Sequence, residues 1–78
     1  MQDGSLLWFD ADKKRDLADK IARAADRYRV KFGQAANICY INIDQLDGLE
    51  GQTVKGVRVL GAENVSINYF RVGVEGAT

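Results

Sequence analysis

The fold of this chain is decided by residues 10–33, which read DADKKRDLADKIARAADRYRVKFG. At 3.6 residues per turn, the apolar side chains of this stretch fall on one face of a helix. These residues are Leu17, Ile21, Ala24, Tyr28 and Phe32. Asp10 can accept hydrogen bonds from the first free amide groups, and Gly33 can adopt the left-handed conformation in which helices commonly end. The pattern predicts one amphipathic helix from Asp10 to Gly33.

Aspartate-led segments recur every seven residues within this stretch, at Asp12, Asp19 and Asp26. Seven residues are close to two full turns, so these acids line one polar flank of the helix and basic residues line the next. A short coiled coil is the alternative interpretation of the repeat. Lys14 and Lys31 would occupy positions in its seam, so we favour a helix that packs on a sheet.

Four other segments have the β-branched and aromatic composition that is typical of strands. They are Ser5 to Phe9 (SLLWF), Asn37 to Ile43 (NICYINI), Gln52 to Leu60 (QTVKGVRVL) and Val65 to Val74 (VSINYFRVGV). Gly56 is expected to form a bulge, and Gly61 to Asn64 to form a hairpin loop between the last two strands. Whether Ser5 to Phe9 joins the sheet or forms a docking arm stays open.

The element order is therefore strand, helix, strand, strand, strand. This order predicts an α+β fold, a two-layer sandwich in which one long helix packs on a mostly antiparallel sheet of three or four strands. A helix of about 22 residues would be about 33 Å long and would overhang a short strand. The whole chain, residues 1–78, is expected to form a single domain.

The small size of the domain favours association. A domain of this length buries only about 60% of the surface that its unfolded chain exposes. Cys39 is the single cysteine and histidine is absent, so neither an internal disulfide nor a zinc finger can reinforce the core. Oligomerisation is the remaining way to enlarge the core, and we expect a homodimer or a subunit bound to a protein partner.

Cellular location and charge restrict the partners. The chain shows no signal peptide and no apolar run near 18 residues, so we expect no membrane partner and a cytoplasmic protein. The formal net charge is zero, which gives no overall attraction to nucleic acid. The helical stretch has an excess of basic residues, and the rest of the chain has an excess of acidic ones.

An acidic segment, Asp44 to Gly51 (DQLDGLEG), is expected to form a turn that Asp44 caps and Gly48 ends. Its acids recur at every third residue, whereas a calcium loop places oxygen ligands at alternate positions. The segment therefore does not predict a calcium site, and an unpatterned divalent site stays open.

The residues that carry most enzyme chemistry are missing. Without histidine there is no serine–histidine triad and no imidazole base, and neither GxxxxGK[ST] nor GxGxxG occurs. Cys39 lies between Ile38 and Tyr40 in an apolar strand, where burial should raise the pKa of its thiol and make it inert. We expect no catalytic residue, no cofactor and no metal ligand, so an enzyme or enzyme subunit is the least favoured class.

The leading hypothesis is a small interaction or structural protein that self-associates or binds a protein partner. Apolar residues on both faces of Asn37 to Ile43 indicate a central strand, with one face under the helix and the other exposed or covered by a partner. The partner would contact this uncovered sheet face or the overhanging helix. The candidate contacts are Trp8, Tyr40, Tyr69 and Phe70.

The alternative hypothesis is a weak nucleic-acid-binding module. Basic residues on one flank of the helix would contact phosphates or an acidic partner, and outward-facing aromatic residues would stack on bases. The candidate basic contacts are Lys13, Lys20, Arg23, Arg27 and Lys31. The neutral net charge and the interleaved Asp16 weaken this alternative.

Overall fold

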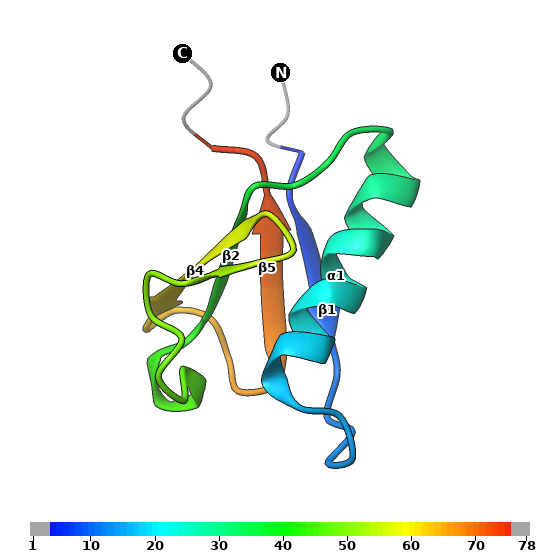
Figure 1. The fold of residues 1–78 in the computed structure, drawn as a ribbon. Helices are drawn as coiled ribbons and strands as arrows, with labels where there is room; N and C mark the ends of the chain where they lie inside the picture. The colour runs from blue at the N-terminus through cyan, green and yellow to red at the C-terminus, as the bar shows by residue number, and fades with distance from the viewer. Residues whose placement is uncertain (1–3, 76–78) are drawn as a thin grey trace.

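The computed structural model describes residues 4–75, which form one α-helix and a five-stranded sheet (Figure 1). The elements in chain order are β1 (Leu6–Phe9), α1 (Leu17–Phe32), β2 (Ile38–Asn42), the 3-10 turn η1 (Ile43–Gln45), β3 (Thr53–Val54), β4 (Val57–Ala62) and β5 (Tyr69–Gly73). The α+β class and the predicted order of elements are confirmed. The sheet has five strands instead of three or four.

The strand order in the sheet is β1-β5-β2-β4-β3. β5 is antiparallel to both β1 and β2, β3 is antiparallel to β4, and β2 is parallel to β4. Ser5 to Phe9 therefore contributes a strand of the sheet, at one edge. The predicted β4–β5 hairpin is wrong, because β2 lies between these two strands and the chain crosses from one side of β2 to the other.

The segment Gln52 to Leu60 is not a single strand. The chain reverses at Lys55 and Gly56, whose φ angles of 50° and 79° are both left-handed. Two adjacent residues with positive φ form the kind of tight turn that joins hairpin strands. Gly56 thus lies in the turn of the β3–β4 hairpin and not at a bulge, and β4 continues to Ala62.

The helix starts later than the sequence predicts. Its N-cap is Asp16, whose carboxylate accepts a hydrogen bond of 2.8 Å from the amide of Asp19. Asp10 is buried and instead accepts the amide of Asp12 at 3.0 Å and pairs with Arg15 at 3.3 Å. The predicted end is confirmed, because Gly33 has a φ of 75° and its amide bonds to the carbonyl of Arg29 at 2.8 Å.

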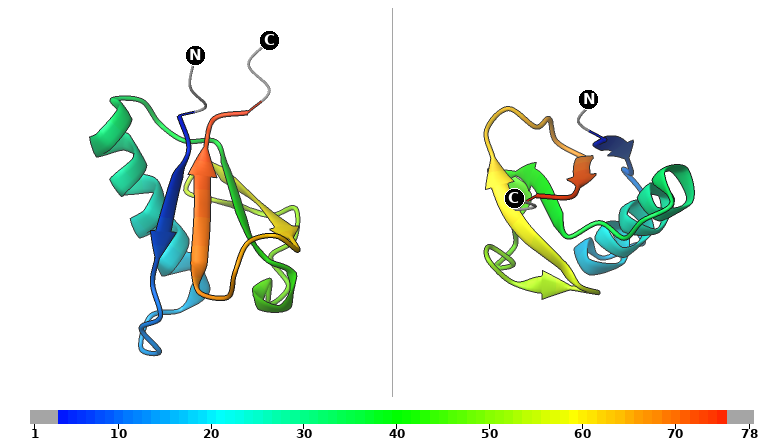
Figure 2. Two further views of the ribbon diagram at one scale, coloured as in Figure 1. Left: turned by 180° about the vertical axis from the view of Figure 1, so that it is seen from behind. Right: turned by 90° about the horizontal axis from the view of Figure 1, so that it is seen from above.

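The core lies between α1 and one face of the sheet (Figure 2). Ile21, Ala24 and Tyr28 of α1 are buried, and alternate residues of the central strands meet them. These strand residues are Cys39, Ile41, Val57, Val59, Phe70 and Val72. Each large side chain that is fully buried contributes about 1.5–3 kcal/mol to folding. Within residues 4–75, no helix or strand lies over the other side of the sheet, which we call the open face.

Candidate binding site on the open face of the sheet

The open face carries the strand residues that alternate with the core residues. Leu7 and Phe9 of β1 are 59% and 54% exposed, and they lie beside Arg71 and Tyr69 of β5. The rings of Phe9 and Tyr69 are 5.0 Å apart between centroids. The next rows of the face are formed by Ile38 and Tyr40 of β2 and by Arg58 and Leu60 of β4. We call Leu7, Phe9 and Tyr69 the apolar strip.

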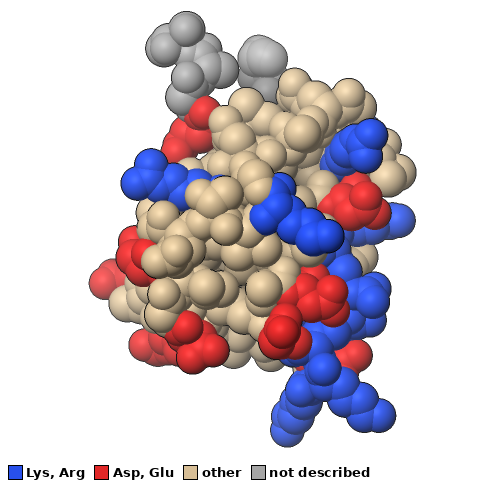
Figure 3. Space-filling model, in the orientation of Figure 1, with Lys and Arg blue, Asp and Glu red and all other residues tan. Residues whose placement is uncertain are grey.

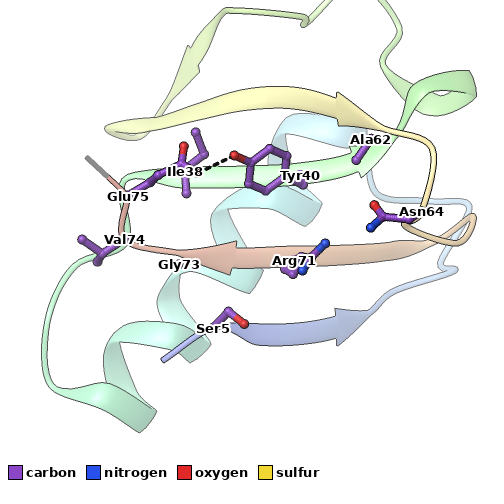
Figure 4. A pocket seen from close by; sticks show the side chains of 9 residues that line it. All are labelled: Ser5, Ile38, Tyr40, Ala62, Asn64, Arg71, Gly73, Val74 and Glu75. Atoms are coloured by element: carbon purple, nitrogen blue, oxygen red, sulfur yellow. Dashed lines mark hydrogen bonds between the residues drawn. The ribbon is translucent and has the colours of Figure 1, made fainter. Parts of the chain in front are cut away.

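A hollow of about 380 Å³ opens on this face beside Tyr40 and Arg71 (Figure 4). Its lining residues are Ser5, Ile38, Tyr40, Ala62, Asn64, Arg71, Gly73, Val74 and Glu75. Gly73 has no side chain and that of Ala62 is a single methyl group, so both leave space above the strands. A second hollow of about 490 Å³ is lined by Leu7, Asn64, Val65, Ser66, Tyr69 and Arg71. Arg71 and Asn64 border both hollows.

Hydrogen bonds fix one rim of the first hollow. The hydroxyl of Tyr40 donates to Oε2 of Glu75 at 2.7 Å. The amide nitrogen of the Asn37 side chain donates to the carbonyl of Glu75 at 2.9 Å, and its side-chain oxygen accepts the amide of Glu75 at 2.8 Å. The hydrogen bond to Glu75 raises the pKa of Tyr40, with desolvation and the negative charge of Glu75 acting in the same direction and Arg71 opposing it. Glu75 is therefore held against Tyr40.

Arg71 brings a positive charge to the middle of the open face. Its guanidinium carbon lies 5.9 Å from the centroid of the Tyr40 ring, in a cation–π arrangement. No carboxylate among residues 4–75 forms an ion pair with it. Its nitrogen donors are therefore available to a ligand that reaches the two hollows.

Two of the four predicted aromatic contacts, Tyr40 and Tyr69, lie on the open face. Trp8 points to the other side of β1, where it is half-buried and the guanidinium carbon of Arg27 lies 5.5 Å from its ring centroid. Phe70 is fully buried in the core, so it is not accessible to a partner in this structure. The alternation along β5 places Phe70 under the sheet and its neighbours above it.

The predicted basic residues do not gather into an uninterrupted stripe. Lys13 precedes the helix, and Arg23 lies 3.4 Å from the carboxylate of Asp19. Arg27 is over Trp8, and the ammonium of Lys31 is 5.7 Å from the ring of Phe32. Figure 3 shows basic and acidic side chains interleaved over α1 and the loop before it. Lys20 is the fifth predicted residue, and no ion pair joins it to a carboxylate within residues 4–75.

The acidic turn after β2 has a structural role. Asn42, and not Asp44, caps η1, because its side-chain oxygen accepts the amide of Asp44 at 2.8 Å. Oε1 of Glu50 accepts the amide of Gly61 at 3.0 Å, which ties the turn to β4. Within residues 4–75 there is no group of three or more histidine, cysteine, aspartate or glutamate residues that could hold a metal ion.

Cys39 is confirmed as a core residue. It is fully buried, and desolvation raises the pKa of its thiol to about 12. A thiol with this pKa is almost entirely protonated near neutral pH and is a poor nucleophile.

The sequence did not single out Arg71, Asn64, Gly73 or Glu75. Only the position of Arg71 in the otherwise apolar run from Tyr69 to Val74 could have indicated it. Asn64 follows β4 and Glu75 follows β5, and they line the hollow from opposite ends because these two strands run in opposite directions in the sheet (Figure 4).

Comparison of the chain with protein-family models, curated proteins and solved structures found no match. The helix of residues 4–75 lacks the length and the apolar character needed to cross a membrane.

Proposed function

We propose that this domain is a non-catalytic interaction module that binds a protein partner, or a second copy of itself, through the open face of its sheet. The observation that carries the proposal is the apolar strip. Leu7 and Phe9 each expose more than half of their surface, and Tyr69 continues the same patch. An uncovered face of a sheet usually carries polar side chains, so a run of exposed apolar side chains there indicates a contact surface.

Burial of the strip would favour association. Covering a large apolar side chain contributes about 1.5–3 kcal/mol, and aromatic residues are enriched among the side chains that dominate binding energy. A hollow next to the strip gives a partner side chain a place to insert. The predicted contacts Tyr40 and Tyr69 flank Arg71, a residue type that is also enriched at interfaces.

The absence of a reactive thiolate supports a non-catalytic role. Cys39 is buried and protonated, and the chain has no histidine to act as a general base. The single reduced cysteine is also the reason for proposing the cytoplasm as the location.

Sedimentation velocity over a concentration series tests the self-association arm of the proposal. We expect the double variant Leu7→Ser, Phe9→Ser to remain monomeric at concentrations at which the parent chain dimerises. Val30→Ser is the matched control, because Val30 is 70% exposed on α1 and lies away from the open face. Loss of dimers in the control, or dimers that persist in the double variant, would assign the interface to another surface.

A parent chain that stays monomeric leaves a different protein as the partner. Site-specific photo-crosslinking then tests the face, with p-benzoylphenylalanine placed at Phe9 or, as a control, at Val30. The proposal requires a discrete crosslinked product at Phe9 that Leu7→Ser weakens and that position 30 does not give. If neither dimers nor such a product form, the open face is not an interaction surface.

Nucleic-acid binding through the basic flank of α1 is the weaker candidate. Lys13 and Lys20 favour it, because neither forms an ion pair with a carboxylate among residues 4–75. Asp19 weakens it, since this carboxylate lies next to both Arg15 and Arg23. A mobility shift with mixed DNA and RNA at low salt that Lys20→Glu removes would support this candidate, and no shift would end it.

A further inference from the structure

Arg71 combines a backbone that is held within the sheet with a guanidinium that has no ion pair within residues 4–75. Arg71 lies on β5, which has a strand on either side, so its backbone is held within the sheet. Tyr40 lies across from it on β2, and the Tyr40 ring provides a flat surface 5.9 Å from the guanidinium carbon. Arginine remains charged at all physiological pH values and offers five N–H donors in a planar fork. Within residues 4–75 none of these donors has a carboxylate partner.

The positive charge of Arg71 favours an anionic ligand, and Arg58 adds a second positive charge two strands away. Arg58 projects from the same face beside Ile38, and it also lacks an ion pair within residues 4–75. Glu75 is the acid that lines the first hollow, and Oε2 of its carboxylate already accepts the Tyr40 hydroxyl. Asn64 also borders both hollows, so its side-chain amide is a further polar group on their walls. An anionic group between the two hollows would lie against Arg71, which borders both of them.

We propose that the partner of the open face is an extended acidic segment of polypeptide that places a carboxylate against Arg71 and an apolar side chain in each of the two hollows. This inference rests on the proposed function and names the chemistry of the partner. The planar fork of one arginine matches a carboxylate in a bidentate pair. A phosphate carries more negative charge than a carboxylate. The Glu75 carboxylate on the rim of the same hollow would therefore repel a phosphate more strongly than it would repel a carboxylate.

The arrangement of the hollows favours a chain over a small free acid. The hollows of about 380 and 490 Å³ both border Arg71, so a ligand that fills both must extend to either side of its anionic group. The apolar strip lengthens this surface further, since Leu7 and Tyr69 line the second hollow and Phe9 contacts Tyr69. An extended segment with a central acid and flanking apolar residues meets all of these features.

The test compares two capped pentapeptides that differ in one group. The first has one aspartate with two leucines on either side, and the second has asparagine in place of the aspartate. ¹⁵N-labelled protein is titrated with each peptide, and shift changes are followed at the backbone amides of Tyr40, Arg71 and Gly73 and at the Arg71 side-chain Nε–H. We expect the aspartate peptide to bind at least about tenfold more tightly, as a charge-assisted bidentate pair implies.

Three variants locate the effect. Arg71→Gln should remove the difference between the peptides, and Arg71→Lys should keep only part of it because lysine cannot form the planar fork. Gly73→Val should weaken both peptides, because its side chain enters the first hollow. Arg29→Gln is the control, since it removes an exposed charge on α1 in the opposite layer. Dispersed amide spectra establish that each variant is folded.

Other outcomes overturn the inference in distinguishable ways. Equal binding of the two peptides, or a preference that survives Arg71→Gln, rules out the carboxylate contact but leaves the crosslinking test of the open face untouched. Tighter binding of a phosphoserine version would replace the carboxylate with a phosphate. If N-acetylphenylalanine binds as tightly as the aspartate peptide and no crosslink forms at position 9, the ligand is a small organic acid, and both the polypeptide inference and the proposed function fail.

Discussion

Tyr40 and Glu75 are joined by a hydrogen bond of 2.7 Å across 35 residues of sequence. The bond exists because Asn37, just before β2, holds the backbone of Glu75 through two hydrogen bonds of its own. The segment after β5 is thereby fixed along the start of β2, and the carboxylate of Glu75 reaches the phenol. This pair forms the rim of the hollow beside Arg71.

The hydrogen bond between Tyr40 and Glu75 predicts the direction in which the pKa of Tyr40 is shifted. Glu75 raises the pKa of the phenol, so its ionisation should occur above the ordinary value of about 10. Glu75→Gln removes the negative charge, and the pKa of Tyr40 should fall. NMR of the Tyr40 ring over a pH series measures both values. Glu63→Gln is the control, and an equal fall in that variant, or no fall in Glu75→Gln, would contradict the assignment.

The same raised pKa makes stability depend on pH in the alkaline range. The folded chain holds the Tyr40 proton more tightly than the unfolded chain, so the contribution of the pair is fully present below about pH 10. It is lost as the pH rises through the folded-state pKa. Urea denaturation at several alkaline pH values should show a smaller decline for Glu75→Gln than for the parent chain.

Two glycines in the sheet should respond differently to alanine. A Cβ at Gly61 would lie 2.8 Å from side-chain atoms of Ile43 and Leu46, closer than van der Waals contact allows. A Cβ at Gly73 would lie no closer than 3.5 Å to Ser5. Gly61→Ala should cost about 1–3 kcal/mol of unfolding free energy, whereas Gly73→Ala should be neutral or stabilise by about 0.4–1 kcal/mol. Equal effects in urea denaturation would be inconsistent with this packing.

Asp16 should be the acid that stabilises the start of α1. Its carboxylate accepts the amide of Asp19, so Asp16→Ala should lower the unfolding free energy by about 0.5–2 kcal/mol. Asp26→Ala is the matched control, because Asp26 is exposed in the middle of the helix, where alanine has the higher helix propensity. The prediction is wrong if thermal or urea unfolding shows a larger loss for Asp26→Ala than for Asp16→Ala.

Cys39 should react with thiol reagents only after the protein opens. Its thiol is fully buried and has a pKa of about 12, so little thiolate exists at pH 8. Reaction with dithionitrobenzoate should be slow in the native state and immediate in denaturing urea. Rapid modification of the folded protein would show that β2 is exposed more often than the packing implies.

Local signals in the sequence predicted the helix and its end, but not its start. The buried face of α1 and the left-handed Gly33 follow from residues close together in the chain. Asp10 and Asp16 are both good caps by residue type. The choice between them depends on the Asp10–Arg15 ion pair and on the bond from the Asp10 amide to the Asn68 carbonyl, which brings in a residue far along the chain.

The order of the strands in the sheet could not be predicted from the sequence patterns. Lys55-Gly56 is a weaker hairpin signal than Asn-Gly or Asp-Gly, so the β3–β4 turn was missed. The parallel pairing of β2 with β4 and the insertion of β5 beside β2 are non-local contacts, which no periodicity within a strand specifies.

The alternation of side chains along the strands predicted part of the open face, but the prediction that Phe70 contacts a partner was wrong. The phase of β5 is set at Asn68, whose φ of 72° is left-handed and whose amide donates to Oε1 of Gln45 at 2.6 Å. The strand therefore begins at Tyr69, and Phe70 faces the core. Once that phase is known, the positions of Tyr69, Arg71 and Gly73 on one face follow.

The position of β5 between β1 and β2 has a consequence for biosynthesis. Among the strands of residues 4–75, β1 leaves the ribosome first, yet it pairs only with β5, the last of them. Until residue 73 emerges, β1 has no neighbour and β2 can pair only with β4. The sheet therefore stays incomplete in the nascent chain until β5 has been translated and can pair with both β1 and β2.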